Sequence, residues 1–181
     1  MRKKIIIGTA NFSGKYGFFN KKVKNKIKPN LILKNALDYN INKLDLAEVY
    51  FDIKKISKQI KYFNLILKIQ IRKKFSKEEI IKKINEFINK AQKKRIYSLM
   101  LHESKNINSK NYCELIKVIN QLKKEKKIKK FGISVYEVKE VNRFCSLIKP
   151  DIVQFPINIF DQSFLKKQYL KKMKKMGIEL H

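Results

Sequence analysis

The amino-acid sequence predicts an α/β fold of the TIM (β/α)8 barrel type, incomplete, with about six βα units and the start of a seventh strand. Short apolar runs alternate with longer amphipathic runs, as in a parallel sheet covered by helices. Polar residues also stand at the carboxyl ends of successive strand-like runs, where barrel sites are built. An open dinucleotide-binding sheet is disfavoured because Gly8, Gly14 and Gly17 do not have G-x-G-x-x-G spacing.

The predicted strands are short and almost wholly apolar, as expected for buried parallel strands. They cover residues 5–10, 43–47, 65–70, 97–102, 130–135, 151–155 and 178–181. The predicted helices cover residues 31–39, 53–60, 76–94, 109–127, 137–148 and 162–176. Ser76 and Ser109 are suited to cap the two longest helices, and Glu79 completes a capping box with Ser76.

Length and composition indicate a single barrel-like domain over residues 1–181, with 44% hydrophobic residues to form its core. No apolar run reaches the roughly 18 residues of a membrane span, and the apolar stretch at the start is too short for a secretory signal. We therefore expect a cytoplasmic protein without a membrane partner. Cys113 and Cys145 lack a CxxC partner and the chain has only two histidines, so no metal site is expected.

The formal net charge of +29 permits two explanations. Lysine-rich faces bind phosphate backbones through counterion release. Alternatively, abundant Lys, Ile and Asn together are typical of A/T-rich codon usage. The lysines are spread through nearly every polar segment, and the basic runs lack interleaved aromatic residues. We expect no specific nucleic-acid partner, although a phosphate-binding role for some of this charge stays open.

Four residues near the carboxyl ends of successive predicted strands form a candidate catalytic group. Asp45, Lys68 and His102 belong to the second, third and fourth strands, and Tyr50 follows Asp45 by five positions. Each residue alone has a structural explanation, such as a helix cap or a core position. In a barrel, however, they would converge on one cavity, as would Ser134 and Gln154 from the next two strands.

The group has the chemistry of a proton-donating site for a carbonyl compound. A tyrosine has a pKa near 10, so a catalytic Tyr50 needs a cation such as Lys68 to favour its phenolate. Asp45 could hold Lys68 charged by pairing with it. His102 could donate a hydrogen bond to a substrate carbonyl oxygen. A reduction would also require a hydride-carrying cofactor, because no side chain supplies one.

These motifs resemble those of the aldo-keto reductase family, from IIIGTANFSGKYGFFNK onward. LDLAEVY is similar to the family's D-T-A-x-x-Y segment, LILK contains Lys68 and LMLH contains His102. KIKKFGISVY resembles the family's G-x-S segment, and DIVQFPINIFDQ its V-Q-x-x-x-N segment. The resemblance implies a catalytic tetrad of Asp45, Tyr50, Lys68 and His102, with Tyr50 as the general acid.

The resemblance also implies a nicotinamide cofactor, NADP(H) with NAD(H) as the alternative. Ser134 and Gln154 would bind the nicotinamide carboxamide, and Gly8 and Thr9 would lie near its ring. Asn158 would belong to the same cofactor-binding shell. The implied reaction is the NAD(P)H-dependent reduction of an aldehyde or ketone, so the implied partner is a small carbonyl compound.

The sequence departs from the family pattern in composition and in length. Leu46, Phe51 and Val135 stand where the family commonly has Thr, Gly and Asn. The sequence ends at His181, before the segments that complete the barrel and bind the adenosine phosphate in the family. It therefore resembles a C-terminally truncated member. The alternative function is therefore a catalytically silent protein that acts by association with another chain. We also expect a second copy to cover the open barrel edge.

Overall fold

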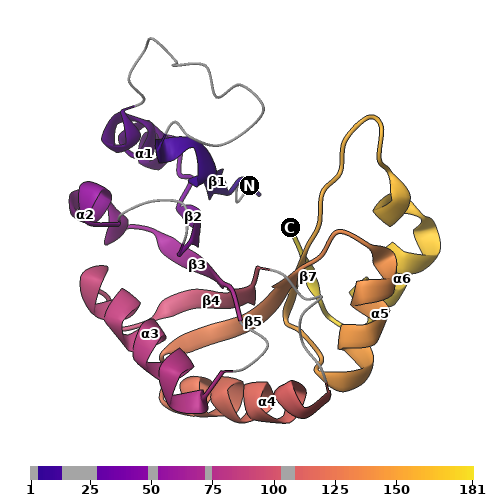
Figure 1. Ribbon diagram of the computed structural model, residues 1–181. Coiled ribbons are helices and arrows are strands. Elements are labelled where there is room, and N and C mark those ends of the chain that lie inside the picture. The colour runs from indigo at the N-terminus through magenta and orange to yellow at the C-terminus, as the bar shows by residue number, and fades with distance from the viewer. Residues whose placement is uncertain (1–3, 14–27, 49–52, 72–74, 103–108) are drawn as a thin grey trace.

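The computed structural model describes residues 4–13, 28–48, 53–71, 75–102 and 109–181. Seven parallel strands form one curved sheet in the order β1-β2-β3-β4-β5-β6-β7, and the helices lie on its outer side (Figure 1). The strands are β1 (Ile7–Gly8), β2 (Lys43–Ala47), β3 (Asn64–Ile69), β4 (Ile96–Leu101), β5 (Ile128–Ser134), β6 (Ile152–Gln154) and β7 (Glu179–Leu180). The result is an open half-barrel, which confirms the predicted incomplete α/β barrel.

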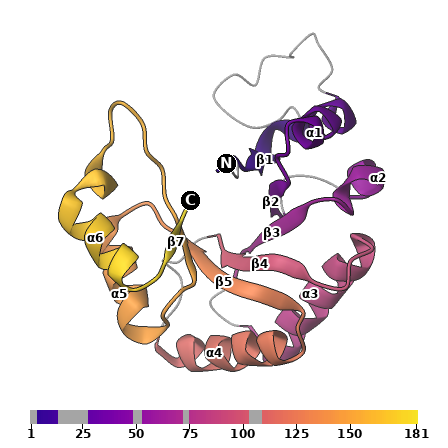
Figure 2. The same ribbon diagram turned by 180° about the vertical axis from the view of Figure 1, so that it is seen from behind.

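The helices follow the strands in regular alternation around the outside of the half-barrel. They are α1 (Pro29–Asp38), α2 (Ser57–Ile60), α3 (Lys77–Lys90), α4 (Ser109–Lys124), α5 (Val138–Leu147) and α6 (Lys167–Lys175). Seen from either side, β1 and β7 lie at the two borders of the opening, with the chain ends near it (Figures 1 and 2). None of the helices in the described part of the chain is long and apolar enough to cross a membrane.

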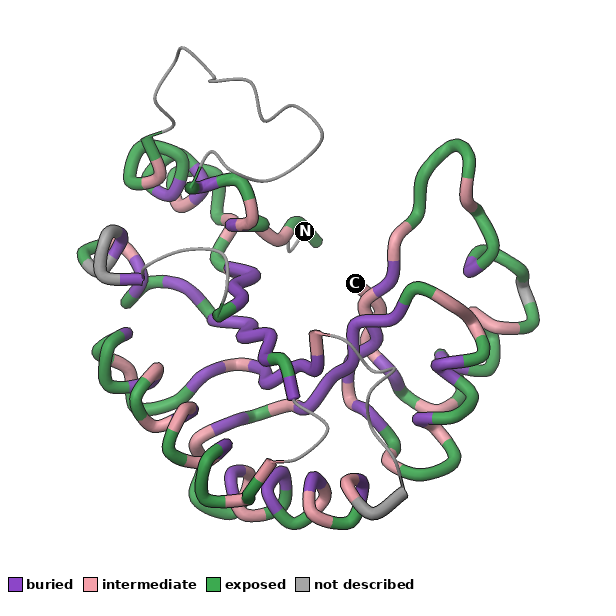
Figure 3. Tube along the Cα trace, in the orientation of Figure 1, coloured by how far each residue is buried: buried purple, intermediate pink, exposed green. Residues whose placement is uncertain are grey.

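Two apolar layers hold the sheet in place. The main core lies between the helices and the outer face of the strands, where Ile84 and Leu115 of the helices and Leu67 and Phe131 of the strands are fully buried. Strands β2 to β6 are accordingly the most continuously buried part of the described chain (Figure 3). A smaller inner layer consists of Ile66, Met100 and Ile152, with Ile6 and Tyr97 packed against it.

The observed elements agree with the predicted order and differ at several boundaries. β1 is restricted to Ile7–Gly8 because, among the described strands, it pairs only with β2, at the edge of the sheet. The helix predicted over 53–60 is a 3-10 turn at Ile53–Ile56 followed by α2. The helix predicted over 162–176 is likewise a 3-10 turn at Ser163–Leu165 followed by α6.

The helix caps were predicted in part. Ser76 caps α3, with its hydroxyl accepting a hydrogen bond from the Glu79 amide at 3.1 Å. Ser109 is the first residue of α4 rather than a residue before it. A capping box that was not predicted begins α5, where the Glu140 carboxylate accepts a hydrogen bond from the Glu137 amide at 3.1 Å.

Close contact between β5 and β6 requires a glycine at position 132. A Cβ atom there would lie 3.0 Å from both Cβ and the carbonyl oxygen of Ile152 and 3.1 Å from Cε of Met100. We expect Gly132→Ala to lower the free energy of unfolding by about 1–3 kcal/mol, since the backbone and the inner layer must shift. Urea denaturation measures the change. Gly8→Ala is the control, because a Cβ at Gly8 meets nothing within 4 Å; equal losses in the two variants would contradict this explanation.

Candidate active site

The centre of the candidate site is a buried ion pair on two neighbouring strands. Asp45 of β2 lies opposite Ile66 of β3, and Lys68 follows Ile66 by two residues on the same face. Lys68 Nζ lies 2.8 Å from Asp45 Oδ2, and both residues are only 8% exposed. A charge pair this far from solvent is stable only when both partners are present. The strand register therefore places an ammonium group and a carboxylate together inside the half-barrel.

Gln154 of β6 reaches across the interior and joins this pair. Its Oε1 accepts a hydrogen bond from Lys68 Nζ at 3.3 Å, and its Nε2 donates one to Asp45 Oδ2 at 3.0 Å. Asp45 Oδ1 is buried and has no hydrogen-bond partner among the described residues. The three side chains thus form a small polar network, in which one carboxylate oxygen accepts two hydrogen bonds and the other is left available.

Hydrogen bonds join the end of β1 to β2, the strand that carries the Asp45 carboxylate. Both the amide and the hydroxyl of Thr9 donate to the Asp45 carbonyl oxygen, at 3.1 and 2.9 Å, and Thr9 is 1% exposed. Gly8 lies opposite Asp45 in the parallel register and is exposed, with open space at its missing side chain. The residues predicted to lie near a cofactor ring therefore stand directly beside the ion pair.

The other predicted site residues occupy different positions. Ser134 ends β5, is 9% exposed and lies opposite Gln154 in the register. His102 directly follows β4, and its amide donates to the Ile69 carbonyl oxygen at 2.9 Å, which fixes it next to the end of β3. Asn158 is exposed, and its Oδ1 accepts hydrogen bonds from the amides of residues 160 and 161, within its own loop. Tyr50 lies outside the described residues.

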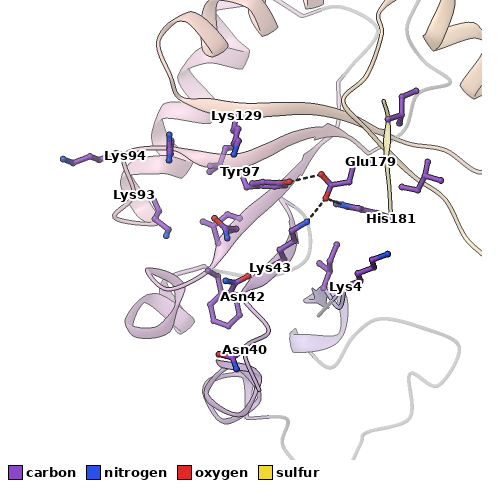
Figure 4. Close-up of a pocket in the computed structure, with 18 of the residues that line it drawn as sticks. Lys4, Asn40, Asn42, Lys43, Lys93, Lys94, Tyr97, Lys129, Glu179 and His181 are labelled. Atoms are coloured by element: carbon purple, nitrogen blue, oxygen red, sulfur yellow. Dashed lines mark hydrogen bonds and ion pairs between the residues drawn. The ribbon is translucent and has the colours of Figure 1, made fainter. Parts of the chain in front are cut away.

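A second polar cluster, at the amino-terminal ends of the strands, was not predicted. Glu179 of β7 is bound by Lys43 at 2.6 Å, by the Tyr97 hydroxyl at 2.8 Å and by His181 Nε2 at 2.8 Å (Figure 4). Lys130 Nζ binds the same carboxylate. The sequence signal that could have revealed this cluster is the alternation of side chains along β2, β5 and β7. Alternation directs a residue near the beginning of each of these strands toward the interior of the half-barrel. The predicted strand at 178–181 thus carries the central acid of this cluster.

The environment of this cluster shifts the pKa values of two of its members. Burial alone would raise the pKa of Glu179, but hydrogen bonds from His181, Lys130, Lys43 and Tyr97 hold that pKa well below the ordinary 4.5. Burial lowers the pKa of His181 below its ordinary 6.5, and the nearby Glu179 carboxylate offsets this only in part. Near neutral pH the carboxylate is therefore charged and the imidazole is neutral.

The curved parallel sheet with helices on its outer side defines an incomplete barrel of the TIM-barrel class, and a carboxylate–ammonium pair is buried inside it. The sequence matches the model of the Aldo/keto reductase family over residues 4–181. The chain therefore belongs to the aldo/keto reductase family. No protein of curated function matches the sequence.

Solved structures of aldo-keto reductases share the fold at low sequence identity. A thermostable aldo-keto reductase bound to the inhibitor epalrestat is 16% identical, with a TM-score of 0.74 over 97% of this chain and 66% of that one. The Klebsiella pneumoniae enzyme in complex with NADPH is 15% identical, with a TM-score of 0.68 over 81% and 54%. The Bacillus halodurans enzyme in its holo form is 18% identical, with a TM-score of 0.70 over 83% and 55%. This chain thus spans between about half and two thirds of these relatives.

Proposed function

We propose that this chain carries the active-site half of an NAD(P)H-dependent oxidoreductase that reduces an aldehyde or ketone. The observation that supports this function best is the 2.8 Å contact between Lys68 Nζ and Asp45 Oδ2, made by two residues that are each 8% exposed. A buried pair of this kind contributes little net stability compared with apolar residues of the same size. Its position inside the barrel, toward the carboxyl ends of the strands, gives it a chemical role instead.

In the proposed reaction Tyr50 protonates the oxygen of the substrate carbonyl. The Lys68 ammonium stabilises the phenolate that remains on Tyr50, and Asp45 keeps Lys68 charged in its buried position. His102, which follows the adjacent strand β4, donates a hydrogen bond that orients the carbonyl oxygen. The four residues Asp45, Tyr50, Lys68 and His102 thereby deliver one proton to one oxygen atom, and Tyr50 regains its proton from solvent.

The nicotinamide cofactor, when bound, supplies the hydride that reduces the carbonyl carbon. Ser134 and Gln154 are adjacent in the β5–β6 register and offer the donors and acceptor that a carboxamide group requires. Gln154 would exchange its bonds with Asp45 and Lys68 for bonds to that group. Gly8 leaves open space beside Asp45, which suits a flat ring. Asn158 would contribute through its amide nitrogen, since its Oδ1 is used within its own loop.

Tyr50→Phe tests the catalytic role. We expect this variant to lower kcat for NADPH-dependent reduction of small aldehydes at least about 100-fold, because general acid catalysis contributes a factor of about 10²–10⁴. The affinity for NADPH should stay within about twofold, since the hydroxyl acts on the substrate. Absorbance at the nicotinamide band measures the rate, and Tyr62→Phe is the matched control, because Tyr62 is exposed and precedes β3, at the opposite end of the strands from the candidate site. Equal rates for both variants would contradict the assignment.

The alternative function is association with another chain without catalysis. It is favoured by the open sheet, since β1 pairs only with β2 and β7 only with β6 among the described strands. The unpaired backbone of an edge strand can form hydrogen bonds with a strand of another chain. Sedimentation equilibrium combined with the rate assay separates the two functions: self-association without any reductase activity would favour the alternative. A reducing, cytoplasmic setting suits both functions, because Cys113 and Cys145 are free thiols.

A further inference from the structure

We propose that the cavity at the amino-terminal ends of the strands binds a small anion that carries two or more phosphate groups. This cavity, called the basic cavity below, has a volume of about 1340 Å³. It lies at the opposite ends of the strands from the candidate active site, so the inference does not rest on the proposed reductase function. Seven of its described lining residues are Lys or Arg, against one carboxylate, Glu179.

The cations converge from separate parts of the fold. Lys94 and Arg95 lie between α3 and β4, Lys129 lies at the start of β5, and Lys174 lies near the end of α6. Lys4 approaches from the residues before β1 (Figure 4). No carboxylate in the described ranges forms an ion pair with any of these five residues. The positive charge of the basic cavity is therefore concentrated in a concave site and not neutralised there.

Some other lysines of the described surface pair with acids instead. Lys117 pairs with Glu114 at 2.7 Å, Lys123 with Asp151 at 2.7 Å, and Lys139 with Glu137 at 2.5 Å. Codon bias explains a general excess of lysine, but it does not explain why acids are nearly absent from one large hollow. A concave site lined by one sign of charge focuses its field on a ligand of the opposite sign.

The single acid of the basic cavity is already engaged. Glu179 accepts hydrogen bonds from Lys43, Lys130, Tyr97 and His181, so its charge is not available to the remaining cations. Lys93 Nζ donates to the carbonyl oxygen of Lys61 at 2.6 Å, and burial lowers the pKa of Lys93. The lowered pKa means that the protein surroundings disfavour the ammonium charge of Lys93. A bound polyanion would relieve that cost.

The lining chemistry favours phosphate groups over nucleic-acid bases. Single-stranded nucleic acids bind where bases can stack on open aromatic rings. The Tyr97 ring already faces Lys43 Nζ at 4.9 Å and Lys130 Nζ at 5.4 Å, and Phe63 is 1% exposed. Asn40, Asn42 and Asn64 line the same wall, and asparagine amide groups can donate to phosphate oxygens. The cavity volume exceeds the roughly 300–1,000 Å³ of an ordinary small-molecule site, so it accommodates a chain of phosphates.

The test is a calorimetric titration of the 181-residue chain with inorganic tripolyphosphate at about 150 mM salt, where exposed charges are screened beyond about 8 Å. We expect saturable binding of one tripolyphosphate per chain. The variant K94Q/R95Q/K129Q should bind at least about tenfold more weakly, because three phosphate-facing cations are removed. These three side chains are exposed, so the substitutions leave the core intact; circular dichroism and urea denaturation verify the fold.

The matched control is K34Q/K82Q/K171Q, which removes the same charge from exposed positions of α1, α3 and α6 that do not line the basic cavity. We expect this control to change the affinity less than about threefold. Equal losses in both triple variants, many weak sites per chain, or no saturable binding would each overturn the proposal. An RNA homopolymer that binds more tightly than tripolyphosphate, with the same sensitivity to K94Q/R95Q/K129Q, would overturn the assignment to a small anion.

Discussion

Lys68→Met is expected to lower the free energy of unfolding by about 3 kcal/mol, among the largest losses for a single substitution in this chain. Methionine fills the volume of the lysine stem but leaves the Asp45 carboxylate, 8% exposed, without its ammonium partner. Breaking a buried pair from one side typically costs about 3–5 kcal/mol, because an uncompensated charge stays in the interior. Gln154 retains one hydrogen bond to Asp45 at 3.0 Å, so the lower end of this range applies. Urea denaturation at pH 7 measures the effect.

Two controls separate the loss of the ion pair from other effects of the substitution. The double variant D45N/K68M removes both charges and should recover most of the lost stability. Lys83→Met breaks a more exposed pair, 3.7 Å from Lys83 Nζ to Glu48 Oε1, and should cost less than about 1 kcal/mol. If K68M and K83M were equally destabilising, Asp45 and Lys68 would not form a buried pair.

A second expected effect is a loss of stability in acid that depends on Glu179. Its folded-state pKa lies well below 4.5, despite burial, because four neighbours bind the carboxylate. The unfolded chain therefore takes up a proton first as the pH falls below about 4.5, and the stabilisation is lost progressively. His181, whose pKa is lowered below 6.5, acts in the same direction, because its unfolded state protonates first as the pH falls below about 6.5.

Glu179→Gln isolates this contribution. At pH 7 the variant should be less stable by about 1 kcal/mol, a value reduced for solvent screening because the side chain is 26% exposed. The difference between the two proteins should shrink as the pH is lowered from 5 to 3, since the wild-type carboxylate then loses its advantage. Urea midpoints across this pH range measure the difference. A difference that stays constant with pH would contradict the assigned ionisation of Glu179.

The order of elements was predictable because each strand and helix carries its own local pattern. The run KLDLA predicts β2 with its observed bounds, Lys43–Ala47, since its two leucines both pack into the main core under the helices. The ends of the chain were less predictable. β1 and β7 each have a single neighbouring strand in the described sheet, so pairing fixes fewer of their residues than the apolar runs suggest. The changes from 3-10 turn to α-helix near residues 57 and 166 depend on tertiary packing. Hydrophobic periodicity along the sequence does not reveal that packing.

The central ion pair of the candidate site was predictable from the sequence, but the hydrogen bonds that join other strands to it were not. Asp45 and Lys68 were expected to pair because they end neighbouring parallel strands, and they lie 2.8 Å apart. The bridge from Gln154 was not expected, since Asp45 and Gln154 are separated by 109 positions and meet only through the curvature of the sheet. Glu179 was missed for a related reason: its partners lie on four different segments, and no local motif marks them.

The most direct test of the proposed function is a fluorescence titration of the 181-residue chain with NADPH at about 150 mM salt, which screens nonspecific attraction to lysines. Three proteins are compared: the wild type, Gln154→Met, and K94Q/R95Q/K129Q of the basic cavity. We expect one NADPH site per chain that Gln154→Met weakens at least about tenfold and that the cavity variant changes less than about threefold. NADPH held by the basic cavity should form a separate second site that the cavity variant removes. Binding that disappears in salt, or that only the cavity variant weakens, would contradict the proposal that Asp45, Lys68 and Gln154 form part of a nicotinamide-dependent active site.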